Sequence, residues 1–409
     1  MQYLLILIFD IFIFEECISR IIPQIRYFDE ILSIISIFCV FVIICLRPKR
    51  IKILNKNDLK IIKYLLVFIV IGFLSTFIYN KNFNITIGML KDILAVVKPF
   101  MNFLFFTIIF KNVDKDKLLV KVSKRCRLYL AVMFIFCIMN YFINIGMDHG
   151  VRFGFRVFTF LYTHPTYLAF SVIILICILI ANNNKRNNVY IVFGMIILIS
   201  TFRSKAFIFV LSYLLINIYY KYSSKFKVRY FIIIGIIGVL CTSSKIEDYF
   251  IHGLDAARPA LYIIGLKILI DYFPFGTGFC SFGSSLSGKY YSPVYAQYGI
   301  NNVSGLTIDN YAYMADSFWP YIVGQFGLSG LIIYLLMLLN IYKSIKLRYS
   351  LSKSKQKAVD LLVFYLLFAS TAEAIFIDVT GQFAFIILAV FLGNYEYNKN
   401  FNLEREDLK

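Results

Sequence analysis

The chain has 409 residues, of which 60% are hydrophobic and only 16% are charged, and its formal net charge is +19. Soluble domains are about half apolar, so this composition excludes an ordinary soluble protein and indicates an integral membrane protein. In a soluble protein the positive charge would suggest nucleic-acid binding. In a membrane protein, basic loops on one side of the bilayer are the better explanation of this charge, so we expect no nucleic-acid partner.

Runs of about 20 mostly apolar residues predict the membrane-spanning helices. The first run lacks the basic start and the small-residue cleavage site of a signal peptide, so we expect a retained membrane helix. The predicted fold class is an all-α integral membrane protein with about twelve transmembrane helices. We expect them near residues 2–19, 30–46, 60–79, 87–110, 126–145, 158–181, 189–202, 204–220, 229–243, 317–342, 358–376 and 379–395.

The charge of the loops predicts their side of the membrane. The loops at 47–60, 111–127, 182–188, 221–229 and 343–357 are rich in Lys and Arg, whereas the alternate loops at 20–29, 80–86, 146–157 and 376–378 hold few or none. Basic loops are cytoplasmic, so both termini are expected in the cytoplasm. The chain then divides into transmembrane helices at 1–243, a large outer loop at 244–316, further transmembrane helices at 317–395 and a cytoplasmic tail at 396–409.

The outer loop is the only long hydrophilic segment. Residues 258–272 begin with Arg-Pro and have apolar residues at helical spacing, which predicts a helix at the membrane surface. The stretch "FPFGTGF" that follows has the residues of a turn. Long ordered loops often carry function, so we expect this loop to contribute to a site.

Cationic residues on the outer side are the first candidates for a site. Arginine gives charge-assisted hydrogen bonds to phosphate, so several converging arginines would suit a diphosphate. Simple snorkelling of Arg203 to lipid headgroups would also explain its position. The predicted outer residues are Arg152, Arg156, His164, Arg203, Lys205, Arg258, Asp309 and Asp316.

Three of these outer residues, together with Tyr313, are candidates for roles toward a sugar. His164, before a helix, could orient or deprotonate a hydroxyl, or could be satisfied locally. Asp316 could act as a base or simply cap the next helix. Asp309 and Tyr313 are candidates for sugar contacts, although the aromatic rings along 290–313 suit membrane-interface anchoring equally well.

The sequence predicts neither a cofactor nor a metal site. No P-loop or Rossmann glycine fingerprint occurs, which argues against ATP chemistry. The eight cysteines have no CxxC spacing, and the three histidines are scattered. A glycosyl donor would therefore be expected to arrive already activated on a lipid.

Four phrases, in this order, resemble the O-antigen polymerase and ligase superfamily. They are "HPTYLAF", "TFRSKAF", "ARPALYIIGLKILIDYFPFGTGF" and "DSFWPYIVGQFGLSGLIIYLLML", and they cover most of residues 150–345. The resemblance implies a GT-C-type glycosyltransferase that acts on undecaprenyl-diphosphate-linked sugars at the outer leaflet. It also implies that Arg203 and Arg258 hold the diphosphate and that His164 belongs to the family's His-Pro element. Independently of the resemblance, we expect the outer cations Lys205 and Arg156 to help bind the diphosphate.

The expected function is that of a polymerase that joins lipid-linked repeat units into O-antigen or capsule. Ligases of this superfamily typically have a histidine before the tenth helix, where this chain has Asp316, which favours the polymerase. The expected partners are the lipid-linked donor and acceptor, membrane lipids and a chain-length regulator, at the bacterial inner membrane. The alternatives are an O-antigen ligase and a flippase, which would line its helices with charges; here those are few, such as Asp10, Glu373 and Asp378.

Overall fold

The computed structural model describes residues 2–46, 54–79, 86–109, 113–222, 251, 253–348 and 352–391. Most of these residues are helical, and the described strands form one two-stranded hairpin. The elements are α1 (Gln2–Ile18), a 3₁₀ helix η1 (Pro23–Tyr27), α2 (Phe28–Leu46), α4 (Lys56–Tyr79), α5 (Thr86–Ile109), α6 (Lys115–Ile143), β1 (Asp148–Arg152), β2 (Phe155–Phe158), α7 (Pro165–Ala181), α8 (Asn187–Ser200), α9 (Ser204–Tyr222), η3 (Gly253–Asp255), α12 (Ala257–Asp271), α13 (Ser285–Lys289), α14 (Val294–Gln297), α15 (Phe318–Arg348), α16 (Lys353–Ala369) and α17 (Val379–Val390).

The described residues contain five helices that are long and apolar enough to cross a membrane. They are Pro23–Leu46, Lys56–Tyr79, Ile87–Ile109, Lys115–Ile143 and Phe318–Lys346, and α7, α8 and α17 are shorter apolar helices. Several of them expose large apolar side chains, such as Phe38, Leu66 and Phe142. An aqueous surface would not favour such side chains, but lipid does. The chain is an all-α membrane protein, as its composition predicts.

The predicted spans coincide with helices, except that 229–243 lies outside the described residues. Three boundaries were wrong. Helix α6 begins at Lys115, within the predicted loop 111–127, because Asp114 caps it by accepting from the Lys117 backbone N–H at 3.0 Å. Helix α7 begins only at Pro165, after a hairpin, and α16 ends at Ala369 rather than at 376.

The hairpin β1–β2 occupies part of the predicted loop 146–157. Its two-residue turn consists of Phe153 and Gly154, whose φ angles are 52° and 79°. Positive φ at both positions is typical of the tight turns that match the twist of two antiparallel strands. The hairpin brings Arg152 back toward the turn between α8 and α9, where its guanidinium lies 3.5 Å from the Phe202 carbonyl.

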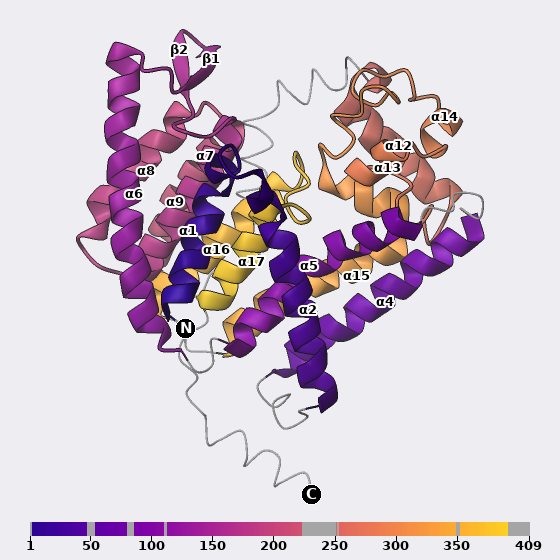
Figure 1. Cartoon of the computed structure of the whole chain (residues 1–409), viewed down its shortest axis with the longest axis horizontal. Helices are drawn as coiled ribbons and strands as arrows, with labels where there is room; N and C mark the ends of the chain where they lie inside the picture. The colour runs from indigo at the N-terminus through magenta and orange to yellow at the C-terminus, as the bar shows by residue number, and fades with distance from the viewer. Residues whose placement is uncertain are drawn as a thin grey trace, which may run out of the picture.

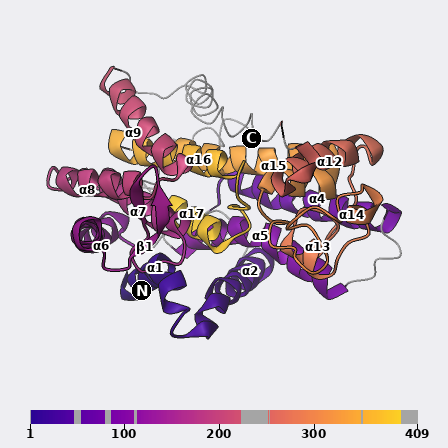
Figure 2. The same cartoon turned by 90° about the horizontal axis from the view of Figure 1, so that it is seen from above.

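The helices form two groups that meet around α1 and α17 (Figures 1 and 2). On one side α6, α7 and α8 pack together, and α16 packs against α7 and α9. On the other side α15 packs along α4, and α5 contacts α2 and α17. Helix α12, the predicted helix of the outer loop, packs on α15. This packing brings the start of α12 and the start of α15 to the same region.

The segment after α12 docks into a break in α15. Gly327 has φ 60° and ψ −157°, so the helical hydrogen bonds stop there. The backbone N–H groups of Thr277 and Gly278 donate instead to the carbonyls of Gly324 and Gln325, at 2.9 and 2.8 Å. The buried Asp92 carboxylate on α5 accepts from the Cys280 backbone N–H at 2.7 Å. The predicted turn is thus confirmed, and it fastens α12 to the helical bundle.

We expect Gly278→Ala to destabilise the protein strongly and Gly299→Ala to do so only slightly. Both glycines have positive φ, but a Cβ at Gly278 would lie 2.5 Å from Thr76 Cα, whereas one at Gly299 would meet nothing within 4 Å. The left-handed conformation alone costs about 1 kcal/mol for alanine. Thermal unfolding in detergent would measure the difference, and equal losses in both variants would contradict the docking of this segment into α15.

Candidate functional site

His164 and Arg203, predicted from separate segments, are in direct contact. Arg203 lies in the turn between α8 and α9, and its Nη2 donates to His164 Nε2 at 2.6 Å. His164 precedes Pro165, the first residue of α7. The turn before it is held by Glu16 of α1, whose carboxylate accepts from the Thr163 backbone N–H at 3.1 Å. Three segments therefore position this pair.

The contact fixes the state of the imidazole. A neutral imidazole has one acceptor nitrogen and one N–H. Because Nε2 accepts from Arg203, the proton of the ring lies on Nδ1. The 3.4 Å approach of the Thr166 backbone N–H to Nδ1 is then a contact and not a capping bond. Burial, followed by the charge of Arg203, lowers the pKa of His164 to about 4. The ring is therefore neutral at pH 7, with its lone pair occupied.

Two ion pairs lie beside the His164–Arg203 contact. Lys205, in the first turn of α9, pairs with Glu373 from the segment between α16 and α17. Arg258, in the first turn of α12, pairs with Asp316 at 2.8 Å. Asp316 precedes α15 by two residues, and its carboxylate holds a guanidinium. Burial raises the pKa of Asp316 above its usual value, while Arg258 opposes that shift.

Electrostatic interactions join these groups into one cluster, here called the cationic site. Glu373 acts on both Arg203 and Asp316, and Arg258 acts on Lys205. The site consists of His164, Arg203, Lys205, Arg258, Asp316 and Glu373. Residues predicted from four separate stretches of sequence thus converge, as expected for an anion-binding site.

The cationic site has unused capacity for an anion. Its cations, with Arg152 of the hairpin, which also acts on Arg203, exceed its two carboxylates in charge. The buried Nε of Arg203 has no hydrogen-bond partner in the described part of the chain. A buried donor without a partner costs about 1–3 kcal/mol, so an acceptor that reaches it would bind favourably.

Three other predicted residues lie apart from these contacts. Arg156 donates to the Asn140 carbonyl at 3.2 Å, where it ties the hairpin to α6. Tyr313 is half exposed, and its ring packs closely over Gly305. A Cβ at Gly305 would lie only 2.1 Å from that ring. Asp309 is exposed, and its charge acts on an aromatic residue of the outer loop. Within the described part of the chain, the contacts of these three side chains lie outside the cationic site.

Two acidic features of the structure are not among the predicted sites. Glu373 holds Lys205, and the signal for it was a carboxylate in the otherwise apolar stretch "ASTAEAIFID". Asp114 and Asp116 form an Asp-x-Asp pair of the kind that can bind a divalent ion. Asp114 instead pairs with the lysine three residues later at 3.2 Å, and Asp116 pairs with Lys355 at 2.6 Å.

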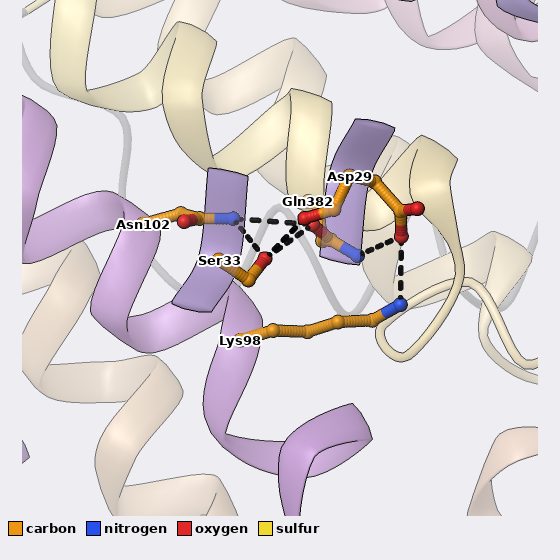
Figure 3. Close-up of polar contacts among 5 residues, drawn as sticks. All are labelled: Asp29, Ser33, Lys98, Asn102 and Gln382. Carbon is orange, nitrogen blue, oxygen red and sulfur yellow. Dashed lines mark hydrogen bonds and ion pairs between the residues drawn. The ribbon is translucent and has the colours of Figure 1, made fainter. Parts of the chain in front are cut away.

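A second polar cluster lies among the helices α2, α5 and α17 (Figure 3). Lys98 donates to Asp29 at 2.9 Å, and the Gln382 amide donates to the same carboxylate at 2.7 Å. Asn102 donates to Ser33 and to Gln382, each at 3.1 Å. Ionisable residues inside membrane helices are costly and usually paired, and here a lysine and an aspartate satisfy each other.

Among the residues that the structure describes, no group of His, Cys, Asp or Glu could hold a metal ion. Arginine and lysine, which dominate the cationic site, are donors to anions and not ligands for metals. Comparison with known proteins adds no identification: no family model, no curated protein and no solved structure matches this chain. The function therefore has to be inferred from the residues of the site.

Proposed function

We propose that the chain is a glycosyltransferase that joins lipid-diphosphate-linked oligosaccharide repeat units into a polysaccharide. The observation that carries this proposal is the convergence of Arg203, Lys205 and Arg258, with an unpaired buried Nε on Arg203. Charge develops on a diphosphate as it leaves the sugar, and fixed cations stabilise that charge without a metal. The ordered phrases around these residues, which resemble the O-antigen polymerases, favour the same reaction.

The donor in this proposal is the growing glycan on undecaprenyl diphosphate, and the acceptor is a new lipid-linked repeat unit. An acceptor hydroxyl attacks the anomeric carbon of the donor while the lipid diphosphate departs. Arg203 and Arg258 bind the diphosphate, assisted by Lys205. The neutral ring of His164 accepts from Arg203 and so orients the guanidinium that binds the diphosphate.

The setting of this reaction is also part of the proposal. About twelve helices in a GT-C arrangement would place the cationic site at the outer leaflet of the bacterial inner membrane, with both termini in the cytoplasm. The basic loops of the sequence support this orientation. A chain-length regulator would be the expected protein partner. The product would be O-antigen or capsule.

The first test uses purified protein and the lipid-linked repeat unit extracted from source cells that lack this chain. No nucleotide, metal or second enzyme is added, and products are separated on a gel that resolves single repeats. We expect a ladder. A single unchanged band would contradict the polymerase; if addition of lipid A core then shifted that band, the enzyme would be a ligase.

A flippase is the second candidate, and the Lys98–Asp29 pair favours it. The pair lies between membrane helices and is buried, with side-chain exposures of 10% and 5%. Transporters often place paired charges at such depth. The polymerase remains favoured because the cationic site keeps an unpaired donor, whereas Lys98 and Asp29 satisfy each other. Protein in sealed vesicles that moves the lipid-linked unit but forms no ladder would decide for the flippase.

A further inference from the structure

Asp378, which immediately precedes α17, differs from the other carboxylates near the cationic site. It is exposed, and its side chain makes no hydrogen bond or ion pair with any residue that the structure describes. Asp316 and Glu373, in contrast, are bound by Arg258 and Lys205. Asp378 is therefore a carboxylate whose oxygens are open to a ligand.

Asp378 interacts electrostatically with charged groups of several helices. The charges of Lys98 on α5, Asp29 on α2, Lys205 on α9 and Glu373 all act on it. Its charge in turn acts on Tyr167 of α7. Groups from five segments thus act on this exposed carboxylate.

A pocket adjoins Asp378, since the two residues that follow it in α17 line that pocket. Its walls come from α1, α7 and α17 and include Glu15, Glu16, Tyr167 and Thr380. Carboxylates, a hydroxyl and an aromatic ring are groups that bind sugar hydroxyls and sugar faces. Glu15 and Glu16 would repel a diphosphate, and the pocket has room for only about one water-sized group, so it suits a single hydroxyl of a neutral sugar.

We propose that Asp378 is the general base of the glycosyl transfer, and that it takes the proton of the attacking acceptor hydroxyl. This inference rests on the proposed function. It assigns the base to neither of the two residues predicted from sequence. His164 presents its only lone pair to Arg203, and Asp316 is bound by Arg258. Asp378, in contrast, interacts electrostatically with Lys205 and Glu373 of the cationic site, directly precedes two residues that line the pocket, and has no side-chain partner among the described residues.

The step balances without any further reactant. The acceptor O–H gives its proton to the Asp378 carboxylate as its oxygen forms the new bond to the anomeric carbon. The bond from that carbon to the diphosphate oxygen breaks, and the electron pair leaves with the lipid diphosphate, which Arg203 and Lys205 hold. Asp378 then returns the proton to water. Desolvation raises the pKa of Asp378 to about 6, which leaves the carboxyl mostly ionised at pH 7.

The buried cluster of Figure 3 positions this base. Gln382 lies one helical turn after Asp378, and its backbone N–H donates to the Asp378 carbonyl at 3.2 Å. The Gln382 side chain is fixed by Asp29, which Lys98 holds in turn. The register of α17, and with it the place of Asp378, therefore depends on contacts from α2 and α5.

The test compares Asp378→Asn and Asp378→Glu with the wild type in the ladder assay, using the extracted repeat unit. A general base contributes about 10²–10⁴-fold, so we expect Asp378→Asn to lose at least about 100-fold in rate. Its Kd for undecaprenyl diphosphate, measured separately, should stay within about twofold, since the base does not bind the diphosphate. Asp378→Glu should recover at least about tenfold over Asp378→Asn, because it restores the carboxylate. Asp271→Asn, at the far end of α12, is the control.

The pH profile adds a readout that a structural role would not produce. The wild-type rate should fall about tenfold per pH unit below pH 6, because protonation removes the base. Asp378→Asn should lack this acidic limb. The inference is overturned if Asp378→Asn keeps its rate within about threefold, keeps the limb, loses diphosphate binding or gains nothing from glutamate. A wild type that makes no ladder would overturn the proposed function and this inference with it, whereas a normal ladder from Asp378→Asn would overturn the inference alone.

Discussion

Replacing Arg203 by alanine is expected to reduce polymer formation by about 10²–10³-fold, the usual cost of removing one donor from a developing anion. Arg203 contributes more than charge, because its Nη2 orders His164 and its Nε is a buried donor without a partner in the described residues. The ladder assay measures the rate. Binding of undecaprenyl diphosphate, measured by calorimetry, should weaken in the same variant.

Arg203→Lys separates charge from geometry. Lysine keeps the charge but cannot offer two parallel donors, so it should recover only part of the rate. Arg186→Ala is the matched control, because Arg186 is an exposed turn arginine at the opposite end of α8. Full-length polymer from Arg203→Ala at normal expression would remove the phosphate-binding role, and a defect of equal size in Arg186→Ala would show that the loss is not specific to the site.

The sequence predicted the cations of the site because a charge inside apolar surroundings is conspicuous. Arg203 and Lys205 interrupt two hydrophobic runs, and Arg258 opens a helix, so each could be named without a structure. Which carboxylate meets which cation could not be predicted in this way. Asp316 and Glu373 are separated from their partners by long stretches of chain, and only the packing of α12, α15 and α16 joins them.

The predicted boundaries of helices and loops were wrong where only the hydrophobic pattern defined them. The hairpin at 148–158 was predicted as a loop, although glycines at 150 and 154 between Val, Phe and Arg were a signal for strands and a tight turn. The start of α6 was placed too late because its first turns are basic, and a basic segment is also what a cytoplasmic loop contains. Charge predicts the side of the membrane better than it predicts the end of a helix.

The charges inside the membrane helices were also underestimated. Asp29 falls at the end of the predicted loop 20–29, whereas Lys98 lies in the middle of the predicted span 87–110, and the sequence gives no sign that the two pair. Their pairing depends on α2 and α5 lying side by side, which no local pattern indicates. The pair is both the best support for the flippase and, through Gln382, the anchor of the proposed base.

Lys98→Met is expected to cost about 3–5 kcal/mol in stability, because it leaves the buried Asp29 carboxylate without its counter-charge. Unfolding in mixed micelles titrated with SDS would measure this loss. The control is Lys117→Met, which removes an exposed lysine from its pair with Asp114 and should change little. Equal stabilities of the two variants would contradict a structural role for the buried pair.

The double variant Asp29→Asn with Lys98→Met decides whether the charge or the packing matters. With both charges gone, no buried ion of this pair is left without its partner, so the double variant should be more stable than Lys98→Met alone. The amide introduced by Asp29→Asn still has a carbonyl oxygen that can accept from Gln382, which would keep α17 in register. Polymer formation should then recover together with stability if the pair only positions α17. If stability recovers and the lipid-linked unit is no longer processed at all, the charges themselves take part in function, as a flippase would require.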